Sequence, residues 1–195
     1  VHDGADKKYN NNFQNITVSL DQKLPFLKGL SAKALFSYDR QIYDAKEWQY
    51  PFTAYAYNDA GEIEEQQGGE AKPSLAVKNK QWTYYTIQAH LNYDRKFGKH
   101  EVGVLGVYER RWGNTIETNA GRKNYDFMIP ELNMGSPVAE FISNSGTSSQ
   151  FAQQGYVMRL NYNYAQKYML ELAGRYDQTY QYAPDRRSAF FPSVS

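Results

Sequence analysis

Apolar and polar residues alternate along six segments of the chain, and this period of two is typical of strands with one apolar face. The clearest case is Trp82–Asp94, in which tyrosine, isoleucine, alanine and leucine alternate with threonine, glutamine, histidine and asparagine. The segments expected to form strands are Phe13–Asp21, Leu30–Tyr38, Trp82–Asp94, His100–Arg110, Tyr156–Tyr164 and Tyr168–Tyr176. Phe190–Ser195 is expected to begin a seventh strand, and no segment has a convincing helical period. The sequence therefore predicts an all-β fold.

Short and long connections alternate between these segments. The short ones centre on KLPFLKG, RKFGK and AQK, and the long ones cover Tyr43–Gln81, Arg111–Gln154 and Gln178–Ala189. The long ones contain stretches rich in glycine, asparagine and serine, such as SNSGTSSQ. Membrane barrels have this arrangement, with short periplasmic turns and long extracellular loops.

The spacing of tyrosines gives a second sign of a membrane barrel. The chain has 18 tyrosines, and three of the expected strands carry a pair eight residues apart. Eight residues at about 3.3 Å each cover about 26 Å of strand. A tilt of about 40° reduces this to about 20 Å of height, close to the apolar band between the aromatic girdles of an outer-membrane barrel. We predict a membrane girdle that contains Tyr85, Tyr93, Tyr156, Tyr164, Tyr168 and Tyr176.

Alternation alone also fits a soluble β-sandwich, whose apolar faces point inward. Tyrosine spacing, alternating connections and expected strands of about nine to thirteen residues favour the barrel. Six or seven strands are fewer than a single-chain barrel needs. The chain is therefore expected to be a section of a large barrel or a truncated eight-stranded one. The alternatives are a small autonomous eight-stranded barrel and a soluble β-sandwich that binds glycans through loop aromatics.

Composition excludes several other classes of protein. The 22 basic and 21 acidic residues give a formal charge of +1, so no general basic field indicates nucleic-acid binding. The chain has no cysteine, and therefore neither a thiolate metal site nor a cysteine nucleophile. The three histidines, His2, His90 and His100, share no metal-ligand spacing. We expect no catalytic site, no metal, no cofactor and no enzymatic activity.

Two motifs carry a family resemblance. GYVMRLNYNYAQKYMLELAGRYD (Gly155–Asp177), followed by RRSAFFPSVS, resembles a late-barrel signature of SusC/RagA-type TonB-dependent (TonB-linked) outer-membrane transporters. LNYDRKFGKHEVGVLGVYE (Leu91–Glu109) is similar to the preceding hairpin of that family. The chain departs from the family pattern at Gln178-Thr179-Tyr180 and at Ser188-Ala189, where the family has GSS and an aromatic-glycine pair.

The resemblance implies a transmembrane antiparallel β-barrel of roughly 22 strands in the bacterial outer membrane, of which this chain supplies about six or seven. Residues 1–195 would be a partial barrel domain, and the plug domain and the TonB-contacting segment would lie outside it. The implied activity is TonB-driven import of a nutrient, either a glycan or a peptide. The implied partners are outer-membrane lipids, a SusD-like lipoprotein, the TonB complex and the nutrient itself.

Candidate binding residues fall into two groups, each of which also has a purely structural interpretation. The residues expected to face the lumen are His90, Arg159, Glu171, Arg175 and Asp177. Charges there tune selectivity in barrels, and they also simply pair across strands. The aromatic residues expected to contact a ligand or a lid protein from the first long loop are Trp48, Tyr50, Tyr55 and Tyr57. Packing within the loop explains these aromatic residues equally well.

Overall fold

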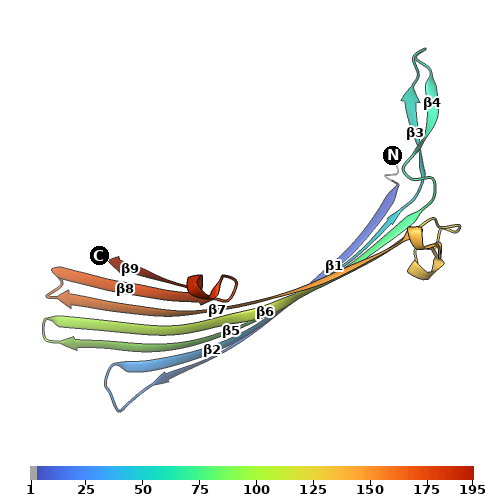
Figure 1. Cartoon of the computed structure of the whole chain (residues 1–195). Helices are drawn as coiled ribbons and strands as arrows, with labels where there is room; N and C mark the ends of the chain where they lie inside the picture. The colour runs from blue at the N-terminus through green and yellow to red at the C-terminus, as the bar shows by residue number, and fades with distance from the viewer. Residues whose placement is uncertain (1–3) are drawn as a thin grey trace. The chain divides into compact units, whose positions relative to one another are not determined.

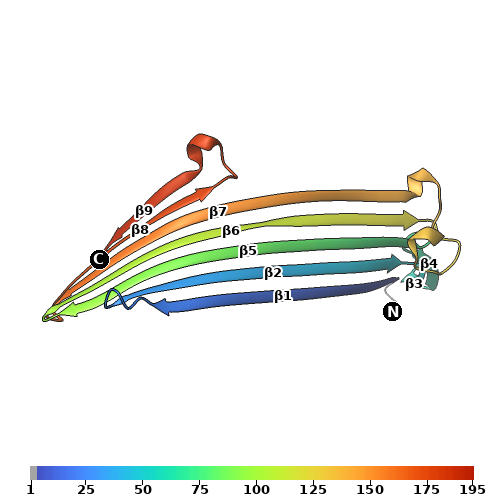
Figure 2. The ribbon, with the colours of Figure 1, turned by 90° about the horizontal axis from the view of Figure 1, so that it is seen from below.

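The structure is a computed structural model that describes residues 4–195. Its main element is a seven-stranded antiparallel sheet in the order β1-β2-β5-β6-β7-β8-β9, in which β1 and β9 are the edges (Figure 2). The strands are β1 (Ala5–Lys23), β2 (Leu30–Gln49), β5 (Ser74–Phe97), β6 (His100–Lys123), β7 (Ile142–Tyr164), β8 (Tyr168–Thr179) and β9 (Ser188–Val194). Between β2 and β5 the chain forms a separate hairpin of β3 (Phe52–Tyr57) and β4 (Ile63–Gly68) (Figure 1).

This topology confirms the all-β prediction and the seventh strand. Residues 4–195 form one main sheet and a hairpin, so the two packed sheets of a β-sandwich are not present among them. The three remaining elements are single 3-10 turns, η1 (Leu132–Met134), η2 (Ala139–Phe141) and η3 (Pro184–Arg186). Among these residues, no helix combines the length and the apolar composition that crossing a membrane requires.

Several strands are much longer than the alternation predicted. The expected connections Tyr43–Gln81 and Arg111–Gln154 were wrong in extent, because the actual connections cover only 50–73 and 124–141. One added segment, ISNSGTSSQ at the start of β7, is mostly polar and every one of its residues is exposed. Alternation reports the burial of one face, so it disappears where both faces contact water although the backbone ladder continues. Short and long connections still alternate, as predicted.

The chain divides into two compact units. Unit 1 contains residues 4–13, Gln41–Gln81 and Thr115–Ser148, and unit 2 contains Gln14–Arg40, Trp82–Asn114 and Ser149–Ser195. Each unit is described by itself below.

Unit 1 has a small aromatic core. Trp48 and Tyr125 meet edge to face with their ring centroids 4.7 Å apart, and Leu75 completes the buried cluster. Leu132 packs against the cluster from the connection 124–141. The Arg122 guanidinium donates a hydrogen bond of 3.2 Å to the carbonyl of Gly135, which fastens this connection to the end of β6. The connection is therefore an ordered cap over the core of unit 1.

In unit 2, the β7–β8 hairpin has the register that the tyrosine spacing indicated. Tyr156 lies opposite Tyr176, and Tyr164 lies opposite Tyr168 next to the turn. The turn places Ala165 at φ 53° and the next residue, Gln166, at φ 58°. Positive φ at both positions matches the twist of a tight hairpin, although neither residue is glycine. The backbone N–H of Gln166 is also held by the side-chain oxygen of Asn163 at 3.0 Å.

Candidate functional site

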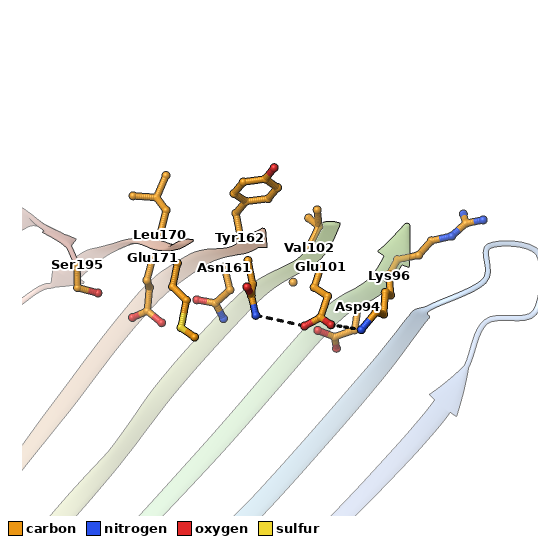
Figure 3. A pocket seen from close by; sticks show the side chains of 13 residues that line it. Asp94, Lys96, Glu101, Val102, Asn161, Tyr162, Leu170, Glu171 and Ser195 are labelled. Carbon is orange, nitrogen blue, oxygen red and sulfur yellow. Dashed lines mark hydrogen bonds and ion pairs between the residues drawn. The ribbon is translucent and has the colours of Figure 1, made fainter. Parts of the chain in front are cut away.

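The sheet of unit 2 has a polar face near the β5–β6 and β7–β8 turns. Figure 3 shows Glu101, Asn161 and Glu171 on one side of the sheet, and Val102, Tyr162 and Leu170 on the other. The residues that line the open groove of about 680 Å³ on this part of the sheet include Asp94, Lys96, Glu101, Asn161, Asn163 and Glu171. Lys96 forms an ion pair with Glu101, and Asn163 donates a hydrogen bond of 3.4 Å to the same carboxylate. The groove therefore offers both hydrogen-bond donors and acceptors to a polar molecule.

The same polar face continues along β5 and β6. His90 is hydrogen-bonded to the side-chain oxygen of Gln88 at 3.1 Å, and Gln88 also donates to Glu109. Between β1 and β2, Thr17 and Ser37 are hydrogen-bonded at 3.1 Å. The polar side chains therefore pair with one another along this face of the sheet.

Arg175 and Asp177 form a second charged pair on this face. The Arg175 Nε donates to both carboxylate oxygens of Asp177, at 2.7 and 2.8 Å. Gly155 lies opposite Asp177 in the register, and a Cβ atom there would come within 2.6 Å of the carboxylate. Glycine at this position leaves room for the pair. A second groove of about 290 Å³ beside it is also lined by Arg186 and Arg187.

The structure places the five predicted lumen-facing residues in four different surroundings. Glu171 lines the first groove, Arg175 and Asp177 form one pair, and His90 contacts Gln88. Arg159 lies opposite Ala173 in the register and is exposed, so it is not brought together with the others. The alternation predicted a common face, and the two pairs named here each lie within a single strand of it, β8 and β5.

The other face of unit 2 is an apolar band. Leu160 lies opposite Leu172, and both help to line a shallow groove of about 340 Å³ together with Val104, Met158 and Phe190. Such exposed leucine, valine and methionine side chains are unfavourable in water. The band therefore requires an apolar neighbour.

Aromatic rings stand in a row at each end of this band. At one end, Tyr156 lies 5.2 Å from Tyr108 and 6.5 Å from Tyr176, measured between ring centroids. At the end near the turns, Tyr164 lies 6.5 Å from Tyr168. On β5 the ring of Tyr85 stacks on Trp112 at 5.3 Å and meets Tyr38 at the same distance.

Two residues of these rows did not stand out in the sequence. Trp112 stacks on Tyr85, and the ring of His100 lies 4.9 Å from Tyr164. The signal that could have identified His100 is its position, since it shares the parity of Val102 and Val104 along β6. The band ends sharply, because the next residues outward, Gln154 and Gln178, are polar and hydrogen-bonded to each other.

The four aromatic residues expected to contact a ligand or lid protein divide into two pairs. Trp48 is only 7% exposed and belongs to the core of unit 1, so its expected role in an exposed loop was wrong. The reason is that β2 continues through Trp48 to Gln49, and that the Trp48 side chain packs against Tyr125 of the connection 124–141. Tyr50 packs against that core. Tyr55 and Tyr57 are 65% and 77% exposed on β3, where they remain free for contacts.

Unit 1 contains a charged cluster that the sequence did not reveal. The carboxylate of Glu117 forms ion pairs of 3.1 Å with Lys78 and with Lys80. A hydrogen bond from Asn119, followed by those from the two lysines, lowers the pKa of Glu117 from 4.5 to about 2. Along β6, Glu117 follows Tyr108 and Trp112 and so lies beyond the aromatic stretch of that strand.

This pKa shift makes the stability of unit 1 depend on pH. Because the pKa of Glu117 is lower in the folded than in the unfolded state, its contribution is complete above pH 4.5 and is lost as the pH falls toward 2. We expect Glu117→Gln to unfold at a lower temperature than the unchanged protein at neutral pH, and the two to converge toward pH 2. Thermal unfolding at a series of pH values measures this.

Glu64→Gln in β4 is the matched control, because Glu64 forms no ion pair within residues 4–195. A difference between Glu117→Gln and the unchanged protein that stays constant from neutral pH to pH 2 would show that the pKa is not lowered.

Within residues 4–195 no group of three or more histidine, aspartate or glutamate side chains is arranged to hold a metal ion. His2 lies outside the described residues. The other two histidines contact Gln88 and Tyr162.

Comparisons with known proteins agree with this geometry. No protein-family model matches the chain. TonB-dependent receptor P3 of Formosa agariphila is 26% identical over 129 residues, which cover 65% of this chain and 12% of the receptor. The chain therefore corresponds to a small part of the length of this relative.

Three solved structures share the fold. The RagAB peptide transporter and the RagAB peptide importer in the open-open state each give a TM-score of 0.82 at 16% identity. The importer in the closed-closed state gives 0.81 at 15%. Each comparison covers 98% of this chain and 20% of the other. The sequence motifs, the similarity to this receptor and the shared fold all support the resemblance to a section of a SusC/RagA-type TonB-dependent transporter.

Proposed function

We propose that this chain forms part of the barrel wall of a TonB-dependent nutrient importer in the bacterial outer membrane. The observation that carries the proposal is the division of one sheet into two faces. Its polar face carries paired charges and grooves, and its apolar band ends in aromatic rows. A wall between lipid and a polar lumen requires this division. The plug domain and the TonB-contacting segment belong to parts of the protein outside these 195 residues.

The open edges of the sheet support a larger barrel. In the described residues β1 and β9 each have one neighbouring strand, so the seven strands do not close on themselves. Unpaired strand edges are unfavourable in a membrane, because no water is available to their backbone groups. Further strands of the same protein would pair with both edges. A barrel of roughly 22 strands follows from the family resemblance.

We further propose that the imported nutrient is a peptide or a glycan and that a SusD-like lipoprotein assists its capture. The polar groove with Glu101, Asn161 and Glu171 offers donors and acceptors that suit either class. Tyr55 and Tyr57 are exposed rings that suit contact with the lipoprotein or the nutrient. The structures named RagAB are a peptide transporter and importer, which favours a peptide. Uptake of labelled peptides and of labelled oligosaccharides, with and without a working TonB, tests both classes.

Cysteine labelling in intact outer membranes tests the wall. The 195 residues contain no cysteine, so the introduced thiols are the only ones in this section. We expect a lipid-soluble maleimide to label Leu160→Cys and Leu172→Cys, because both side chains lie in the middle of the apolar band. A charged, water-soluble maleimide should leave these two positions unlabelled.

Asn161→Cys is the matched control, because Asn161 follows Leu160 in the chain and its side chain points to the polar face (Figure 3). It should react with the water-soluble reagent once that reagent enters the lumen. The wall proposal fails if Leu160→Cys reacts with the water-soluble reagent as readily as Asn161→Cys does.

A further inference from the structure

Basic side chains and aromatic rings surround the two turns that join β5 to β6 and β7 to β8. We name this group the turn cluster, and its members are Arg95, Phe97, Lys99, His100, Tyr162, Tyr164 and Lys167. We propose that the turn cluster binds the phosphate group of an anionic phospholipid whose acyl chain lies in the apolar band. The inference rests on the proposed function, since it requires the band to face lipid.

The backbone brings the two turns together. The N–H of Ala165 donates a hydrogen bond of 2.7 Å to the carbonyl of Lys99, so the β7–β8 turn is attached to the β5–β6 turn. Lys99 and Lys167 are both exposed, one in each turn. Two ammonium groups therefore extend from neighbouring turns at the same end of unit 2.

Aromatic contacts position two further nitrogen groups. The guanidinium carbon of Arg95 lies 4.8 Å from the ring centroid of Phe97, two residues along the same face of β5. The Nδ1 of His100 lies 2.7 Å from the hydroxyl of Tyr162, in a hydrogen bond that either group can donate. These contacts restrict the side chains, which reduces the entropy lost when an anion binds.

Among residues 4–195, no carboxylate pairs with the three permanent cations of the cluster. Arg95, Lys99 and Lys167 form no ion pair with an acidic residue of the part of the chain that the structure describes. The nearest acids in sequence, Asp94 and Glu101, lie on the polar face, where Glu101 already pairs with Lys96. Guanidinium and ammonium groups left without acids are suited to phosphate oxygens.

The apolar band supplies the place for an acyl chain. Along β6, His100 is followed on the same face by Val102 and Val104, and along β7, Tyr164 and Tyr162 are followed by Leu160. Leu160 and Val104 line the shallow groove of about 340 Å³. Gly174 keeps part of this groove open, because a Cβ atom there would lie 3.0 Å from the ring of Phe190. Arg95 and His100 therefore share the parity of the face that carries the groove, and Lys99 and Lys167 lie in the turns at the end of that face.

Native mass spectrometry of the full-length protein in detergent tests the inference. The protein is incubated with phosphatidylglycerol or with zwitterionic phosphatidylcholine, and the lipid retained on the barrel is counted. We expect the unchanged protein to retain phosphatidylglycerol in preference to phosphatidylcholine. The triple variant Arg95→Gln, Lys99→Gln and Lys167→Gln should retain at least about tenfold less phosphatidylglycerol than the unchanged protein. The reason is that each cation near an anionic lipid adds to the binding free energy.

Lys96→Gln is the matched control, because Lys96 lies beside the same turn but pairs with Glu101 on the polar face. It should retain phosphatidylglycerol as the unchanged protein does. Inorganic phosphate should not displace the lipid, because it lacks the acyl chain. If the triple variant does not assemble, Lys167→Gln alone is measured, and a loss of about fivefold is expected.

Equal retention by the triple variant and the unchanged protein would overturn the inference, and so would displacement of the lipid by inorganic phosphate. The labelling of Leu160→Cys separates this failure from that of the proposed function. If the lipid-soluble reagent labels that thiol but the turn variants still retain the lipid, the wall proposal stands and the turn cluster is not the site that binds the lipid.

Discussion

Replacing Leu160 with arginine is expected to prevent most of the protein from assembling in the outer membrane. Leu160 lies midway between Tyr156 and Tyr164 along β7, and its partner Leu172 lies midway between Tyr168 and Tyr176. An arginine at the lipid-facing midplane of a barrel costs about 2–4 kcal/mol. The proportion of folded protein is measured by its heat-dependent mobility on gels, and the free energy of unfolding by urea titration in lipid vesicles.

The neighbouring substitution Asn161→Arg provides the control. Asn161 points to the polar face and lies opposite Glu171, so an arginine there meets water and a carboxylate. We expect its free energy of unfolding to change by less than about 1 kcal/mol. Similar losses at both positions would mean that the two faces of β7 have the same surroundings, which contradicts a wall between lipid and lumen.

Replacing Tyr125 with alanine is expected to release the connection 124–141 from unit 1. Tyr125 is 2% exposed, packs edge to face on Trp48, and lies at the start of this connection. Truncating a buried aromatic ring to alanine costs about 3–5 kcal/mol. A local loss of 3 kcal/mol corresponds to roughly a hundredfold larger open population. Limited proteolysis with chymotrypsin at low enzyme concentration measures this population through the cleavage rate at Phe127.

Tyr125→Phe separates the ring from its hydroxyl. The hydroxyl is buried and has no hydrogen-bond partner within residues 4–195, and burial raises the pKa of the phenol. Removing an unsatisfied buried polar group is neutral or stabilising, by up to about 1–3 kcal/mol. The phenylalanine variant should therefore be cleaved no faster than the unchanged protein. Cleavage as fast as that of Tyr125→Ala would show that the hydroxyl, and not the ring, holds the cap.

The sequence predicts the faces of strands better than their ends. Alternation placed Leu160 and Leu172 on one face and Glu171 on the other, because an apolar band needs every second side chain to be apolar. It could not predict that β7 begins at Ile142, because the first residues of that strand are polar on both sides. Their strand conformation is stabilised by backbone hydrogen bonds to neighbouring strands, and these leave no pattern in the side chains.

Contacts between residues that are distant in the chain also could not be predicted from the sequence. The pair of Arg175 and Asp177 follows from their spacing along one strand, but the need for Gly155 beside them follows from the β7–β8 register. The burial of Trp48 depends on Tyr125, which lies far along the chain in a connection without periodicity. Under the proposed function, the tyrosine spacing is readable in the sequence because the thickness of a membrane is a constraint that acts on each strand separately.

The polar extensions of β6 and β7 have a consequence for how such a protein can diversify. In β7, the residues from Ile142 to Gln150 have exposed side chains, and their backbone belongs to the strand. Hydrogen bonds between strands involve only the backbone, so most substitutions at these positions leave the frame unchanged. New recognition surfaces can thus evolve on hydrogen-bonded strands rather than on mobile loops. Because the strand backbone is already ordered, each new ligand loses little conformational entropy of the protein on binding.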